Sequence, residues 1–101
     1  MRRATLTIPA DHPAFAGHFP GQPLLPGVSL LAEVLEALLD DAELAARIGA
    51  APRVGAVKFL AAVRPGARLT IELDASARGV RFEVKEGERV AASGQFEPAA
   101  S

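Results

Sequence analysis

One segment of the chain combines a histidine with a backbone of restricted shape. It runs Ala16-Gly17-His18-Phe19-Pro20-Gly21-Gln22-Pro23-Leu24-Leu25-Pro26-Gly27-Val28. Proline restricts φ and glycine permits positive φ, so this backbone is expected to hold the His18 imidazole in a defined place. Gly21 and Gly27 would also let a ligand or another chain approach the backbone closely. An imidazole held in this way can accept a proton, or it can simply hydrogen-bond its own loop.

The segment leads directly into a helix that the apolar spacing predicts from Val28 to Ile48. The first N–H groups of a helix have no intrahelical partner and carry the positive end of the helix dipole, so they attract a carbonyl oxygen. A base beside such groups suits removal of a proton α to a carbonyl, because the imidazole takes the proton while the N–H groups stabilise charge on oxygen. The residues alone leave a catalytic and a purely structural His18 both open.

Other chemically able residues are weaker candidates. His12 lies between Asp11 and Pro13, a pattern most typical of a polar turn. Ser29 lies in Gly27-Val28-Ser29-Leu30-Leu31, which is not the Gly-x-Ser-x-Gly nucleophile elbow, and it is expected in the first turn of the helix. The sequence has no cysteine, no metal-ligand spacing and no phosphate-binding glycine pattern, so we expect neither a metal nor a cofactor.

A short strand is predicted before the histidine segment, and a long helix after it. Residues 5–8 alternate between polar and apolar types, as in a half-buried strand. Residues 9–27 hold five of the eight prolines together with apolar side chains, which favours an ordered loop packed on a core. In the helix, one narrow polar stripe crosses an otherwise apolar and buried surface, and Gly49 fits a C-cap. The stripe consists of Glu33, Glu36, Asp40, Glu43 and Arg47.

Four strands are predicted after the helix. Residues 53–64 are almost continuously apolar, which is typical of a strand covered on both faces. Residues 68–74, 81–85 and 89–97 alternate, and this places apolar side chains on one face of each strand. The inward set comprises Leu69, Ile71, Leu73, Val80, Phe82, Val84, Val90, Ala92, Gly94 and Phe96. Tight turns are expected at Pro65-Gly66 and Glu86-Gly87, and a looser one at residues 75–79.

This order of elements predicts the fold class and the assembly. Consecutive strands with short turns pair antiparallel, and a mostly apolar helix must be covered by their sheet. We therefore predict a single α+β domain over residues 1–101, with a five-stranded antiparallel sheet wrapped around one long central helix. Such a sheet has free edges, and pairing an edge with a second copy of the chain removes one of them. We expect a dimer.

Composition excludes several classes of protein. Half of the 101 residues are hydrophobic and the net charge is −1, which argues against a disordered chain and against a dedicated nucleic-acid binder. No apolar run approaches the roughly 20 residues needed to cross a bilayer, so we expect a cytoplasmic protein with no membrane partner. Residues 28–48 carry a net charge of −4 and the remainder +3. The basic remainder is either scatter or a docking surface for an acidic partner.

The histidine segment resembles the signature of a known enzyme family. His18-Phe19-Pro20-Gly21-x-Pro23-x-x-Pro26-Gly27-Val28 is similar to the motif of the β-hydroxyacyl-acyl carrier protein dehydratases, which have the hotdog fold. Val57-Lys58-Phe59 and Val63-Arg64-Pro65-Gly66-Ala67-Arg68-Leu69 look like the second strand and turn of that family. The resemblance covers roughly residues 12–73, and the order of elements agrees over the whole chain.

The resemblance implies an activity and a set of site residues. The substrate would be a 3-hydroxyacyl thioester on an acyl carrier protein, and two chains would join edge to edge. His18 would remove the C2 proton, and the backbone N–H groups of Gly27 and Val28 would polarise the thioester carbonyl. An acidic residue from the partner chain's helix would protonate the departing hydroxyl. Substrate contacts are expected at Phe19, Gly21, Pro26 and Phe59.

At the position of the catalytic acid the sequence departs from the family. That position, five residues after Gly27, holds Ala32, and Glu33 follows about 100° further around the helix. Glu33 belongs to the polar stripe, although a small shift of the helix start would turn it into the site. Two alternative functions therefore stay open beside that of a dehydratase. One is a non-catalytic subunit that binds acyl thioesters or their carrier, and the other is a hotdog thioesterase. A homodimer is expected, with a hetero-oligomer containing a related subunit as the alternative.

Overall fold

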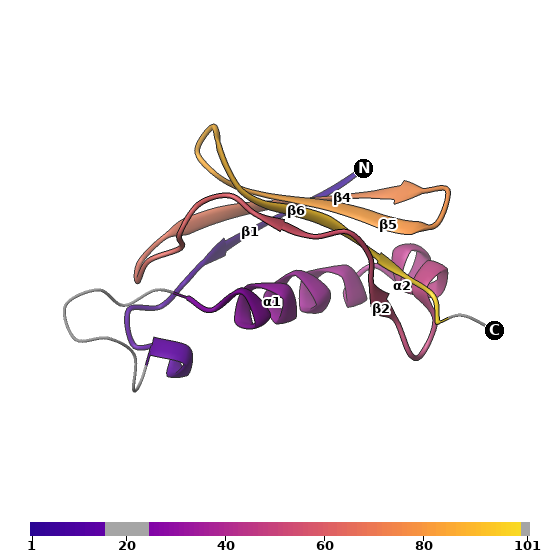
Figure 1. Ribbon diagram of the computed structural model, residues 1–101, viewed down its shortest axis with the longest axis horizontal. Coiled ribbons are helices and arrows are strands. Elements are labelled where there is room, and N and C mark those ends of the chain that lie inside the picture. Colours follow the sequence, from indigo (N-terminus) through magenta and orange to yellow (C-terminus); the bar gives the residue numbers. More distant parts are fainter. Residues whose placement is uncertain (16–24, 100–101) are drawn as a thin grey trace.

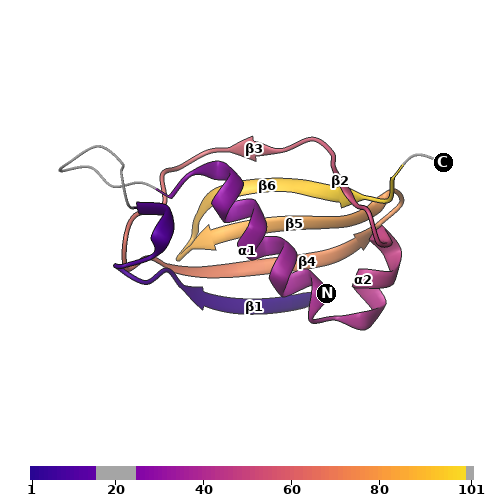
Figure 2. The same cartoon turned by 90° about the horizontal axis from the view of Figure 1, so that it is seen from below.

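The computed structural model describes residues 1–15 and 25–99. These residues form one sheet with the helices on one of its faces. The elements are β1 (Arg2–Thr7), the 3-10 helix η1 (Pro13–Phe15), α1 (Gly27–Leu39), α2 (Ala42–Ile48), β2 (Arg53–Val54), β3 (Lys58–Phe59), β4 (Arg68–Ser76), β5 (Gly79–Glu86) and β6 (Arg89–Glu97). All strand pairs are antiparallel, in the order β1-β4-β5-β6-β2, and β3 also pairs with β6. Helix α1 crosses the face of the sheet diagonally (Figures 1 and 2). The predicted arrangement of an antiparallel sheet around a helix is confirmed.

The core lies between α1 and the central strands. Helix α1 contributes Leu30, Val34 and Leu38, whose spacing of four residues places them on one face. Strands β4 and β5 contribute every second residue, as predicted from their alternating sequences. The buried residues of these two strands are Leu69, Ile71, Leu73, Val80, Phe82 and Val84. Burial of these aliphatic and aromatic side chains is the main force that holds α1 on the sheet.

Strand β6 departs from simple alternation. Val84 pairs with Ala92 but Lys85 pairs with Val90, so Ala91 is an extra residue in β6. Ala91 and Ala92 are both buried as a result. The sequence predicts Val90, Ala92, Gly94 and Phe96 on one face. This holds from Ala92 onward but not for Val90, because the inserted residue reverses the orientation of the residues before it.

The helical region forms two helices, so the prediction of one helix from Val28 to Ile48 is wrong. Helix α1 ends at Leu39, and α2 begins after Asp41, whose side-chain Oδ1 accepts the Leu44 N–H at 3.1 Å. This N-cap satisfies a donor that a continuous helix would have bonded to a carbonyl one turn earlier. The C-cap at Gly49 is as predicted, with φ at +71°. Arg47 then joins α2 to the β4–β5 turn, where its Nε donates to the Gly79 carbonyl at 3.0 Å.

The apolar segment 53–64 does not form the buried strand that its composition predicts. It forms the two short strands β2 and β3 at the sheet edge, so the sheet has six strands instead of five. Phe59 and Leu60 are 52% and 59% exposed, and Val54 is also exposed. Two apolar residues of α1, Val28 and Leu39, are exposed as well, although the helix pattern predicted their burial. The chain is apolar at these positions, and no described part of the same chain covers them.

Two further details concern the ends of strands. Ser76 pairs with Gly79, so the β4–β5 connection is a tight two-residue turn and not the looser one predicted.

At the β2 edge, strand β2 is joined to β6 by the Arg53 Nη2 to Glu97 Oε1 ion pair of 3.0 Å. The Gln95 side-chain amide and then Arg53 lower the pKa of this largely buried carboxyl group.

Candidate active site

Helix α1 begins at the end of the predicted catalytic segment. Leu25 donates its N–H to the Val63 carbonyl at 2.8 Å, and Pro26 is the N-cap with ψ of 148°. The first helical hydrogen bonds run from Ser29 and Leu30 to the Pro26 carbonyl, at 3.0 and 3.1 Å. The N–H groups of Gly27 and Val28 precede these bonds and point out of the helix end. No side chain caps this terminus within the described residues.

An apolar cavity lies directly beside this helix start. Its volume is about 490 Å³, and its walls are Leu25, Gly27, Leu30 and the segment from Phe59 to Val63. The Phe59 ring lies over Gly27, where a Cβ atom would be 2.7 Å from the ring Cζ. A glycine therefore lets the Phe59 ring lie this close to the helix, and a larger residue would have to displace the ring. The cavity offers an apolar surface next to N–H groups that can bind an oxygen atom.

The sequence-predicted site residues fall into two groups. Gly27, Val28, Pro26 and Phe59 lie together around the helix start, with Val28 the most exposed of them at 75%. His18, Phe19 and Gly21 belong to residues 16–24, outside the described part of the chain. The structure therefore describes the helix start at which Gly27 and Val28 are predicted to bind the carbonyl, and both that role and the role of His18 stay predictions.

The two acid candidates occupy different surroundings. Ala32 is exposed on α1. Glu33 is partly shielded, and its Oε1 lies 3.2 Å from Nε2 of His12. Glu33 therefore does not lie simply on a solvated stripe with Glu36 and Asp40, because it contacts the turn after β1. Its catalytic role is not tested by this contact.

His12 is the residue whose importance the sequence understated. It lies in a turn, as predicted, but its side chain reaches a carboxylate 21 residues away instead of acting only within the turn. Its ring also contacts Phe15 edge to face, with centroids 6.0 Å apart. The contact with Glu33 leaves no local pattern in the sequence, because α1 must first dock on the sheet for Glu33 to come near His12.

Similarity to known proteins covers nearly the whole chain. A sequence model for the ApeI-like family, described as ApeI dehydratase, matches residues 2–95. The chain belongs to the ApeI-like dehydratase family. The hotdog fold and the dehydratase family expected from the histidine motif are thereby confirmed.

Individual relatives of this ApeI-like chain agree. It is 34% identical over 79 residues to the 3-hydroxyacyl-[acyl-carrier-protein] dehydratase FabZ of Chloroflexus aggregans, covering 72% of this chain and 55% of that one. It is 29% identical over 98 residues to the FabZ dehydratase of a Thermoanaerobacter species, covering 88% and 69%. The chain thus spans between about half and two thirds of the length of these relatives. Among solved structures, the dehydratase heterocomplex ApeI:P from Xenorhabdus doucetiae aligns with a TM-score of 0.75 at 25% identity, covering 94% of this chain and 83% of that one.

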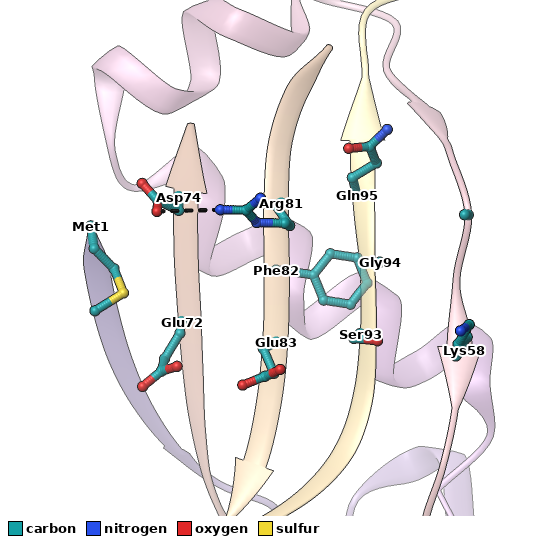
Figure 3. Close-up of a pocket in the computed structure, with 11 residues that line it drawn as sticks. Met1, Lys58, Glu72, Asp74, Arg81, Phe82, Glu83, Ser93, Gly94 and Gln95 are labelled. Carbon is teal, nitrogen blue, oxygen red and sulfur yellow. Dashed lines mark ion pairs between the residues drawn. The ribbon is translucent and has the colours of Figure 1, made fainter. Parts of the chain in front are cut away.

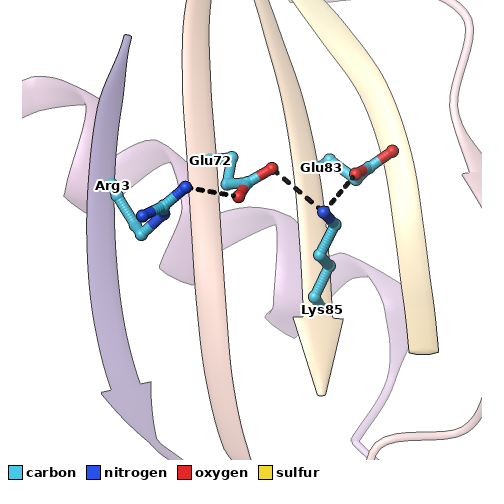
Figure 4. A network of polar contacts seen from close by, with 4 residues as sticks. All are labelled: Arg3, Glu72, Glu83 and Lys85. Carbon is cyan, nitrogen blue, oxygen red and sulfur yellow. Dashed lines mark hydrogen bonds and ion pairs between the residues drawn. The ribbon is translucent and has the colours of Figure 1, made fainter. Parts of the chain in front are cut away.

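A second hollow of the ApeI-like chain, on the outer face of the sheet, has a different character. It measures about 630 Å³ and is bordered by polar side chains, among which Asp74 and Arg81 face each other across two strands (Figure 3). Beside it, Lys85 joins Glu72 and Glu83, and Arg3 joins Glu72 (Figure 4). The Lys85 ammonium lowers the pKa of Glu72, and Glu83 and then Glu72 raise that of Lys85. These charges pair with one another on the outer face of the sheet, away from the start of α1, so we do not choose this larger hollow as the candidate site.

The described residues also bear on metal binding and on membrane crossing. Among residues 1–15 and 25–99, no three potential ligands from His, Cys, Asp or Glu come together around a common point. In the same part of the chain, neither helix has the length and apolar character that crossing a bilayer requires.

Proposed function

We propose that the chain removes water from a 3-hydroxyacyl thioester, carried by an acyl carrier protein, to give the trans-2-enoyl thioester. The observation that carries the proposal is the uncapped start of α1 at the wall of an apolar cavity, directly after the His18 segment. The N–H groups suit a thioester carbonyl, and the cavity suits an acyl chain. The family membership and the FabZ relatives support the same reaction.

In this proposal, groups on the chain serve every step except protonation of the departing hydroxyl. His18 accepts the C2 proton, and the electron pair of that C–H bond forms the C2–C3 double bond while the C3–O bond breaks. The N–H groups of Gly27 and Val28 stabilise the charge that develops on the thioester oxygen. The departing hydroxyl gains a proton and leaves as water. Phe19, Gly21, Pro26 and Phe59 contact the substrate around this centre.

The proton for the departing hydroxyl is the incomplete part of the site. Ala32 at the family's acid position cannot supply it, and Glu33 already contacts His12. These two observations favour a second candidate function, a subunit that binds the acyl thioester and relies on a related chain for the acid. A general acid contributes about 10²–10⁴-fold in rate, so the isolated chain would then be slow. The similarity to a dehydratase heterocomplex is consistent with such a related chain.

The exposed apolar surface supports an association of chains. Val28 and Leu39 on α1, with Val54, Phe59 and Leu60 on the edge segment 53–60, are five of the six large hydrophobic side chains that are exposed in the described residues. Val28, Val54, Phe59 and Leu60 lie at or beside the β2–β3 edge, whereas Leu39 is at the other end of α1. Exposed apolar side chains next to a sheet edge are typical of a subunit interface. We assign this surface to a second copy of the chain. Association with a related hotdog chain instead of a second copy would contradict this assignment.

The test of the proposed function uses purified protein and a 3-hydroxyacyl thioester on carrier protein, with the coenzyme A thioester as a second arm. Formation of the enoyl thioester is followed by its absorbance, and a thiol-reactive dye in parallel detects hydrolysis. We expect enoyl product with no free thiol, and loss of at least about 10²-fold in rate for His18→Ala. Thr5→Ala, at an exposed position on β1, serves as the matched control. Release of free thiol would instead establish a thioesterase, and an active His18→Ala variant would rule out His18 as the base.

Ala32→Glu separates the two candidate functions. If the chain relies on another subunit for the acid, this substitution raises the rate of the isolated protein, because it restores a carboxyl group at the family's acid position. An unchanged rate would count against that candidate. If wild type binds the substrate thioester without turnover and Ala32→Glu has a higher rate of dehydration, the chain is a substrate-binding subunit that relies on another chain for the acid.

A further inference from the structure

The turn after β1 is held by contacts within itself and at its start. Ile8 donates its N–H to the Ala67 carbonyl at 2.8 Å, which fixes the point where the chain leaves the sheet. In the following residues 9–15, here called the 9–15 turn, the N–H of His12 donates to the Pro9 carbonyl at 3.1 Å. The N–H of Phe15 donates to the His12 carbonyl at 3.0 Å. The edge-to-face contact of the His12 and Phe15 rings closes the turn. The turn is therefore a compact unit centred on His12.

A side-chain contact between described residues joins the 9–15 turn to the helix that carries the candidate site. His12 Nε2 and Glu33 Oε1 are 3.2 Å apart, and the two side chains are only 19% and 22% exposed. Partial shielding matters because fully exposed ion pairs contribute little, whereas a shielded hydrogen bond to a carboxylate is stronger. Figure 2 shows η1 beside the first half of α1, as this contact requires.

The contact lies at one end of the segment that carries His18. Residues 16–24 connect the 9–15 turn to Leu25, and Leu25 is itself fixed to Val63 by its 2.8 Å hydrogen bond. Both ends of the segment are thus attached to the body of the protein, one through His12 and Glu33 and the other through the backbone. We propose that His12 and Glu33 form a positioning pair that fixes the 9–15 turn, which leads directly into the His18 segment, against α1. This proposal rests on the proposed function for its catalytic consequence.

Glu33 faces a hollow other than the apolar cavity. Gly27 and Leu30 line the apolar cavity on the side of the edge segment. Glu33 lines a separate hollow on the other flank of α1, together with Arg2 and Leu6 of β1. A carboxylate on that flank reaches His12 and lies away from the apolar cavity of its own chain.

Activity measurements distinguish a positioning pair from a general acid. We expect His12→Ala and Glu33→Ala each to lower kcat by about tenfold or more, with KM changed by less than about twofold, because small displacements of a catalytic group reduce turnover strongly. The double variant should lose little more than either single one, as for two residues that act through one contact. Glu33→Gln, which keeps a hydrogen-bonding side chain, should retain most of the rate. Glu36→Ala, an acidic residue on the same side of α1, is the matched control.

The alternative outcomes are distinct. If Glu33 is the general acid, Glu33→Gln loses as much rate as Glu33→Ala, and His12→Ala keeps nearly all of it. Either full activity of Glu33→Ala or additive losses in the double variant would also overturn the positioning pair. A merely stabilising contact would lower the melting temperature of both variants and leave kcat at 25 °C unchanged.

Hydrogen exchange tests the contact independently of catalysis. In His12→Ala and Glu33→Ala, amide exchange in residues 9–15 should be about tenfold faster than in wild type, because opening of the turn no longer breaks the contact with α1. Glu36→Ala should exchange like wild type. Unchanged exchange in both variants would overturn the positioning pair. If wild type shows no turnover on any thioester, the proposed function fails while this measurement still decides whether the pair exists.

Discussion

At the scale of single residues, Gly27 is where the helix start, the apolar cavity and the edge segment meet. Its backbone N–H faces the proposed carbonyl site, and its missing side chain leaves room for the Phe59 ring. The two roles have different physical origins. The first needs only a helix N-terminus, whereas the second needs a glycine because any Cβ would touch the ring.

Gly27→Ala tests the second role. The added methyl group would lie 2.7 Å from Phe59 Cζ and displace a ring that is half exposed and free to move. We expect the free energy of unfolding to change by less than about 1 kcal/mol, because alanine also favours the helix. The KM for a long acyl thioester should rise, since one wall of the cavity shifts.

The same substitution in a Phe59→Ala background is the control. With the ring removed, Gly27→Ala should add little further change in KM, because nothing remains for the methyl group to displace. An equal effect of Gly27→Ala in both backgrounds would show that the glycine acts through something other than Phe59.

At the scale of elements, the helical region is divided into α1 and α2, and α2 packs near the β4–β5 turn. Helix α1 ends at Leu39, and its short length leaves α2 free to turn and pack against the sheet near the β4–β5 turn. Two consecutive aspartates mark the break. Asp40 is the C-cap of α1, and Asp41 caps the start of α2 through its side chain.

Asp41→Ala and Asp40→Ala form a matched pair that tests this break. Loss of the Asp41 cap leaves the Leu44 N–H without its acceptor, so we expect a loss of about 1 kcal/mol in the free energy of unfolding. Asp40→Ala, one residue away with the same charge, should change it by less than about 0.5 kcal/mol. Urea denaturation followed by circular dichroism measures both. Equal losses would mean that charge, and not the cap, is responsible.

At the scale of the whole molecule, the described chain leaves an apolar surface without a cover. The sheet buries one side of α1, but Val28 at the helix start and the edge residues Phe59 and Leu60 are exposed. The proposed cavity opens on this same surface, since Phe59 and Leu60 also line it. A second chain placed there would both bury apolar area and close the cavity from water, which couples assembly to the proposed activity.

Leu60→Glu tests the assembly. Wild type is expected to sediment at about twice the mass of one chain, and the variant at the mass of one, because a carboxylate at the centre of an apolar interface is costly to bury. Thr5→Glu, on the exposed β1 edge, should leave the mass unchanged. A monomeric wild type would exclude the homodimer and favour association with a related chain.

Much of this architecture is predictable from local sequence. Alternation in residues 68–74 and 81–85 records which face of each strand is apolar, and both strands are as predicted. The Pro26-Gly27 step marks the helix start, and Gly49 marks a helix end, because each residue type has few backbone conformations that suit its position. The histidine motif identified the family without any structure.

Tertiary structure alone decided the rest. The apolar segment 53–64 has the composition of a buried strand, but composition cannot tell burial within one chain from burial against another, and here the segment is an exposed edge. The extra residue at Ala91 depends on its pairing with β5 and not on its own neighbours. His12 and Glu33 meet only because the sheet brings α1 beside the turn after β1. Local periodicity reports which side of an element is apolar; which partner lies against that side is determined by the folded chain as a whole.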